Sequence, residues 1–94
     1  MTTAADLPRF RSILDFIGRF PLRTEEQASE VIDALCRNAG AAFRKIGDGY
    51  ELRLAGILAV DAQRLHLVQG WTRHAERRLA AAAPGRTAQQ QAPA

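Results

Sequence analysis

The chain has 94 residues, which fits one small domain and leaves little room for a large core. Hydrophobic residues make up 47% of it, but eighteen of them are alanine, so large core-forming side chains are few. The single cysteine excludes an internal disulfide and a metal site of clustered cysteines. The sequence contains neither a run of eighteen apolar residues nor the basic-then-apolar pattern of a signal peptide, so we expect a cytoplasmic protein that does not enter a membrane.

The charge is basic and unevenly distributed. The net charge is +3, with a pI near 10.0. Residues 1–40 carry five basic and six acidic groups (net −1), whereas residues 41–94 carry eight basic and four acidic groups (net +4). An anionic partner would therefore meet the second half of the chain. Twelve of the thirteen basic residues are arginine, which together with abundant alanine also matches the composition that a GC-rich genome encodes.

Two helices are predicted in the first forty residues. Asp6 is a candidate cap for a helix over about 7–19, whose apolar residues share one face: Phe10, Ile13, Leu14 and Ile17. A second helix over 24–39 is predicted to begin at a capping box of Thr24 and Gln27 and to stop at Gly40.

The centre of the chain, residues 43–60, carries the strand signal. Tyr50, Leu52 and Leu54 alternate with polar residues, and Gly47-Asp48-Gly49 before them is typical of a turn. Residues 41–46 are either a further helical turn or a strand paired with 50–55, and the turn favours the hairpin. Gly56 is interpreted as a bulge or a crowded backbone position, with 57–60 continuing as an extended run.

A long helix is predicted to follow, with Asp61 as its N-cap. Its apolar stripe is Leu65, Val68, Thr72, Ala75, Leu79 and Ala82, and a homodimer through this stripe would enlarge a small core. The predicted fold is thus α+β, in the order helix, helix, β-hairpin, helix. The long C-terminal helix packs on a small antiparallel sheet within a single domain, residues 1–83, and residues 84–94 form a disordered tail.

No catalytic constellation is recognisable, so we expect a protein that is not an enzyme and has no metal or cofactor. His66 and His74 are eight residues apart on one helix, about 12 Å along its axis, and cannot share an ion. Cys36 adjoins the apolar stripe of the second helix and is interpreted as a core residue, with a reactive thiol as the alternative. The glycines at 47 and 49 lack the rest of a phosphate-binding loop.

The candidate contact residues lie in the basic second half: Arg44, Lys45, Arg53, Trp71, Arg73 and Arg77. Arg44, Lys45 and Arg53 could share a face of the hairpin, and Trp71 is either a core anchor or an exposed binding residue. A protein partner is the preferred interpretation. The alternative is a DNA- or RNA-binding regulator resembling a winged helix, although only residues 40–43 remain for its recognition helix.

Residues 48–79 carry one resemblance. DGYELRLAGILAV, followed by QGWTRHAERRL, resembles short uncharacterised proteins of proteobacterial phages and prophages. The shared elements are a Gly-Tyr strand start, an apolar strand ending near Gly56 and a tryptophan in the final helix. The resemblance implies an accessory protein of a phage or mobile element, a class that includes regulators and inhibitors of host defence. It carries no catalytic motif.

Overall fold

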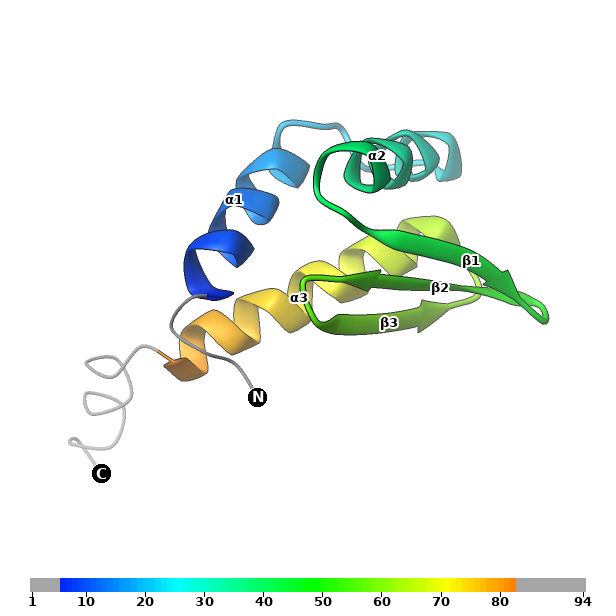
Figure 1. The fold of residues 1–94 in the computed structure, drawn as a ribbon. Coiled ribbons are helices and arrows are strands. Elements are labelled where there is room, and N and C mark those ends of the chain that lie inside the picture. The colour runs from blue at the N-terminus through cyan, green and yellow to red at the C-terminus, as the bar shows by residue number, and fades with distance from the viewer. Residues whose placement is uncertain (1–5, 83–94) are drawn as a thin grey trace, which may run out of the picture.

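The computed structural model describes residues 6–82 and confirms an α+β fold (Figure 1). Its elements are α1 (Asp6–Gly18), α2 (Glu25–Asn38), β1 (Ala42–Ile46), β2 (Gly49–Leu54), β3 (Ile57–Asp61) and α3 (Arg64–Ala82). The predicted tail, residues 84–94, and the side chain of the predicted cap Asp6 lie outside the described part of the chain. Among the described helices, none is long and apolar enough to cross a membrane.

The first two helices lie close to their predicted ranges because their end signals are local. The capping box is present: the Thr24 hydroxyl accepts from Gln27 N at 3.1 Å, and Gln27 Oε1 accepts from Thr24 N at 3.1 Å. Gly40 follows the C-cap with a φ of 72°, the left-handed conformation that ends helices and favours glycine. Arg9 of α1 also donates to the Ala39 carbonyl at 3.2 Å, which satisfies a free acceptor at the end of α2.

The sheet is an antiparallel meander in the order β1-β2-β3, so the predicted hairpin is confirmed and gains a third strand. Residues 42–46 form a strand, which settles the choice left open by the sequence. The interpretation of Gly56 as a bulge or crowded position is wrong. Ala55 and Gly56, with φ of 53° and 80°, form a two-residue turn between β2 and β3, and a Cβ at Gly56 would meet no heavy atom within 4 Å.

The core lies between the sheet and the three helices. Leu52 and Leu54 of β2 and Ile57 of β3 are buried against α3, and α1 and α2 also pack on α3. Trp71 is fully buried, and its indole N–H donates to the Leu54 carbonyl at 3.0 Å. An aromatic side chain of this size with its polar atom satisfied joins the sheet to the helix.

The apolar stripe of α3 is used inside this core. Val68 and Ala75 are fully buried, and Leu65 and Leu79 are partly buried against the same cluster. The predicted homodimer through this stripe therefore has no free apolar helix face to use.

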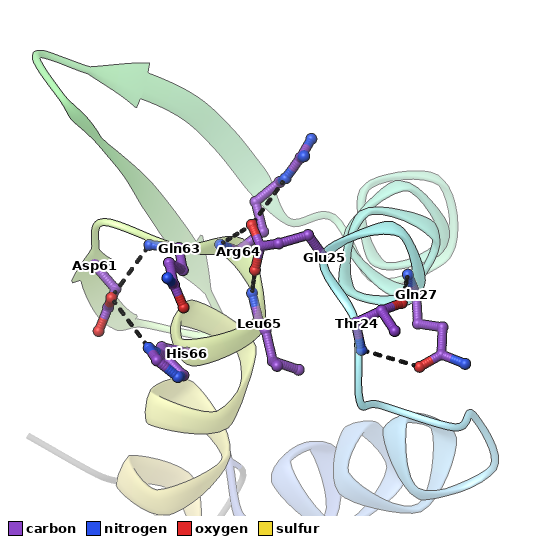
Figure 2. A network of polar contacts seen from close by, with 8 residues as sticks. All are labelled: Thr24, Glu25, Gln27, Asp61, Gln63, Arg64, Leu65 and His66. Carbon is purple, nitrogen blue, oxygen red and sulfur yellow. Dashed lines mark hydrogen bonds and ion pairs between the residues drawn. The ribbon is translucent and has the colours of Figure 1, made fainter.

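The start of α3 differs from the prediction. The helix begins at Arg64, and Asp61 is the last residue of β3, where its carboxylate accepts from Gln63 N at 3.2 Å. The carboxylate at the helix N-terminus comes from α2 instead: Glu25 accepts from Arg64 N at 2.9 Å and from Leu65 N at 2.7 Å (Figure 2). The prediction of Asp61 as the N-cap is thus wrong, because a residue distant in sequence satisfies these amides.

Candidate partner-binding surface

One face of the sheet is turned away from α3, and we call it the outer face. Since side chains alternate along a strand, it consists of every second residue of the meander. Its members are Ala42, Arg44 and Ile46 of β1, Glu51 and Arg53 of β2, and Leu58 and Val60 of β3. The strand register aligns them in rows across the sheet, Arg44-Glu51-Val60 and Ala42-Arg53-Leu58.

A carboxylate held by two arginines forms the polar half of the outer face. Arg44 Nη2 lies 3.0 Å from Glu51 Oε2, Arg44 Nε donates to both carboxylate oxygens at 3.2 Å, and Arg53 Nε lies 3.3 Å from Oε1. Glu51 is buried beneath the two guanidinium groups, whereas the arginine side chains are each 66% exposed. These side chains also line a shallow hollow of about 280 Å³ over β1 and β2.

The charges of this group stabilise one another. The hydrogen bonds donated by Arg44 are the largest cause that holds the pKa of Glu51 below its ordinary value, with a smaller effect from the Arg53 charge. The same bonds raise the pKa of Arg44. The carboxylate thus compensates part of the basic charge, and the outer face carries one net positive charge from two arginines and one glutamate.

The apolar half of the outer face lies on β3. Leu58 is 49% exposed and Val60 is 56% exposed, and they are the exposed large hydrophobic residues within the part of the chain with described side chains. They are two residues apart on one strand and therefore adjacent on the same face. This exposed apolar pair bordered by arginines is the candidate contact surface of the chain.

The structure does not bring the six predicted contact residues together. Arg44 and Arg53 share the outer face, but Lys45, exposed and adjacent to Arg44 in β1, points to the opposite side, so the shared face predicted for all three is wrong. Trp71 is fully buried and is excluded as a surface contact.

The two arginines of α3 form a separate group. Arg73 and Arg77 are exposed, and helical spacing places them on the side of α3 away from Trp71, hence away from the sheet. Arg73 borders a hollow of about 470 Å³ that α1 and the following segment also line, with Ile17 and Phe20. The α3 arginines and the outer face therefore cannot contact one small ligand or one flat partner surface together.

The residues considered for chemistry remain scattered. Cys36 is exposed, so its interpretation as a core residue is wrong, and partial burial of the sulfur together with Asp33 raises the pKa of its thiol. A raised pKa lowers the thiolate fraction and thus the reactivity. His66 Nδ1 lies 3.9 Å from Asp61 Oδ1 (Figure 2). Across the described residues, no three metal-ligating side chains gather.

Of the outer face, the sequence singles out only Arg44 and Arg53 as contact residues, and three members that matter for binding are not among the predicted contacts: Glu51, Leu58 and Val60. The alternation indicates only that Glu51 is polar, but a carboxylate two residues before Arg53 and opposite Arg44 in a hairpin register predicts the pairing. The sequence pattern does not place Leu58 and Val60 on this face, because it predicts that 57–60 continue the strand past Gly56. A turn at Ala55-Gly56 would have placed every second residue of 57–61 on the exposed side.

Comparison with known proteins gives no relative. No protein-family model, curated protein or solved structure matches the chain. The functional argument therefore depends on the geometry of the surface alone.

Proposed function

We propose that this is a non-catalytic regulatory or inhibitory protein that acts by binding another protein through the outer face. The observation that carries the proposal is the exposed pair Leu58 and Val60, which lie beside two arginines on an uncovered sheet face. Burial of apolar surface supplies affinity, and arginine at its border supplies directional hydrogen bonds. Occupying a surface needs no catalytic group.

The chemistry of the outer face favours a partner that combines apolar and acidic side chains. Arg44 and Arg53 each use part of the guanidinium for Glu51 and remain 66% exposed, so donors stay free for a carboxylate or a carbonyl. Glu51 holds the two side chains in place, which lowers the entropy lost on binding. The resemblance to phage and prophage proteins supports a host protein as the target, with inhibition of host defence as the biological setting.

The test uses the purified chain as bait and then defined components. Candidate partners captured from lysate are purified, and their affinity is measured for the wild type, for Leu58→Glu and for Arg53→Glu. We expect each substitution to weaken binding at least about tenfold, because one places a charge in the apolar contact and the other reverses a charge. The matched control is Arg77→Glu on α3, which should bind like the wild type. A partner whose affinity is lost with Arg77→Glu and kept with both outer-face variants would refute the proposal.

A second function is favoured by one observation, the exposed Arg73 and Arg77 on α3. These side chains are four residues apart on one helix face and could contact nucleic acid phosphates. The described outer face would add little to such binding, because it carries no aromatic side chain for base stacking and Glu51 already neutralises part of its charge. Nucleic-acid binding would be seen as a gel shift at low salt that falls steeply as salt rises and is lost in Arg73→Ala/Arg77→Ala. Absence of any shift at low salt would exclude it.

A further inference from the structure

The free edge of β3 lacks the features that normally protect an edge strand. β3 is the last strand of the meander, and its sequence Ile-Leu-Ala-Val-Asp has neither proline nor lysine and no charge before Asp61. Natural sheets protect exposed edges with charges, prolines or bulges, because unpaired backbone groups are a template for another strand. The register from Leu54↔Ile57 to Tyr50↔Asp61 is continuous, so no bulge distorts this edge.

The turn that precedes β3 determines which residues face the free edge. In a hairpin with a two-residue loop, the pair that flanks the loop is of the hydrogen-bonded type, here Leu54 and Ile57. Hydrogen-bonded and non-hydrogen-bonded pairs alternate, so Ile57, Ala59 and Asp61 direct their backbone groups to β2. The N–H and C=O groups of Leu58 and Val60 therefore point outward. The residues with free backbone groups are thus the same two whose apolar side chains are exposed.

The strand is complementary to itself about Ala59. When a second β3 is placed antiparallel with Ala59 opposite Ala59, Leu58 lies opposite Val60 of the partner subunit and Val60 opposite Leu58 of the partner subunit. Each such pair can exchange two backbone hydrogen bonds, and its Cβ atoms come to about 5 Å. Four apolar side chains then adjoin on the outer face. Asp61 lies opposite Ile57 of the partner subunit, so no like charges face each other.

The other edge strand, β1, is not complementary to itself in this way. In a symmetric pairing of β1 about its central residue, Arg44 would face Arg44 of the partner subunit, and like charges directly opposite each other destabilise a strand pair. A symmetric pairing about the central residue is therefore more favourable at β3 than at β1.

We propose that two copies of this chain pair antiparallel through β3 and form one continuous six-stranded sheet. The symmetry is the isologous two-fold arrangement that is commonest among homodimers. The proposal goes beyond the partner-binding function and does not depend on it. It also replaces the stripe of α3 as a dimer contact, since that stripe is already used in the core.

The oligomeric state of the full chain tests this pairing by sedimentation over a broad range of concentration. We expect a monomer–dimer equilibrium for the wild type. Val60→Lys, with a charge at the apolar pair, and Val60→Pro, which removes an outward N–H without touching the β2–β3 ladder, should each raise the dimer Kd at least about tenfold. Ala42→Lys, on the outer face of β1, is the matched control and should dimerise like the wild type. Val60→Lys keeps the test valid if Val60→Pro does not fold.

Disulfide trapping tests the register in a Cys36→Ser background. A mixture of Leu58→Cys and Val60→Cys chains should cross-link rapidly with an oxidant, because opposite residues in a strand pair lie within disulfide range. Each variant alone should cross-link much more slowly, because its two cysteines are offset along the strands.

A wild-type chain that stays monomeric throughout, a dimer unaffected by both Val60 variants, or equal cross-linking in the mixture and the single variants would overturn the proposal. Binding of another protein's strand to a monomeric chain would overturn it too. Arg53→Glu lies on β2, outside the paired strands, and should dimerise like the wild type while it weakens binding to the partner protein. The dimer and the partner-binding function can therefore fail independently.

Discussion

Glu25 connects the N-termini of two helices, and removing its carboxylate is the clearest perturbation of the fold. In Glu25→Ala, the amides of Arg64 and Leu65 lose acceptors at 2.9 and 2.7 Å, at the start of a 19-residue helix. Loss of a helix cap costs about 0.5–2 kcal/mol. The Glu25 side chain is 40% exposed, so water replaces part of the lost interaction, and we expect a destabilisation of about 1 kcal/mol.

The measurement is chemical and thermal unfolding of Glu25→Ala beside Glu26→Ala. Glu26 also lies in the first turn of α2, so the control subtracts the effect of an acidic residue on that helix and leaves the contact with α3. A difference of about 1 kcal/mol corresponds to roughly 4–8 °C in Tm for a domain of this size. Equal stability of the two variants would refute the view that Glu25 caps α3.

The pH dependence supplies a second check on the same contact. Hydrogen bonds from the Leu65 backbone are the largest cause that lowers the pKa of Glu25, with further contributions from Arg64. A carboxyl whose pKa is lowered on folding stabilises the protein fully above its unfolded pKa, and this contribution is lost as the pH falls through the folded value. The stability difference between the wild type and Glu25→Gln should therefore be constant near neutral pH and shrink in acid. A difference that grew on acidification would contradict this reasoning.

Three further substitutions test other parts of the structure. Gly70→Ala should stabilise the protein by about 0.5–1 kcal/mol in urea unfolding, because alanine favours a helix over glycine and the new Cβ would meet only Arg73 Nη2, at 4.0 Å. A loss of stability would indicate that the position is crowded. Ala55→Asn should stabilise it by about 1 kcal/mol, since asparagine adopts the positive φ of this turn at a lower energetic cost than alanine. No gain in Tm would refute strain at Ala55. Gly49→Ala should destabilise it by about 1–3 kcal/mol, because the new Cβ would lie 2.9 Å from the Asp61 carbonyl oxygen. If thermal unfolding followed by circular dichroism shows the variant to be as stable as the wild type, the close approach is refuted.

The predictions that succeeded depend on residues close together in sequence. The capping box of Thr24 and Gln27 spans one helical turn, and the β1–β2 hairpin closes over two residues, so both follow from local chemistry. The cap of α3 could not be predicted because Glu25 and Leu65 are 40 positions apart. Asp61 was the better local candidate, but it takes part in its own turn with Gln63.

The candidate surface was predicted only in part, for two physical reasons. Strand alternation places the side chains of Lys45 and Arg44 on opposite faces of the sheet. Trp71 is buried because its apolar area outweighs its single polar atom, and the indole N–H donates to the Leu54 carbonyl. Leu58 and Val60 depended on recognising a turn whose first residue is alanine. The first position of such a turn is usually asparagine, aspartate or glycine, and alanine rarely adopts positive φ. With Ala55 at this position, the sequence does not indicate a turn.

The two short turns of the meander also bear on the order in which the chain folds. Each joins neighbouring strands across two residues, and isolated hairpins form in about 1–10 μs. Glu25 and Arg64 are 39 positions apart in the sequence, and the entropy of closing a loop costs about 0.6 kcal/mol more for each doubling of its length. We therefore expect the meander to pair before α2 docks on α3. Substitutions in the turns should change the folding rate, whereas Glu25→Ala should mainly accelerate unfolding.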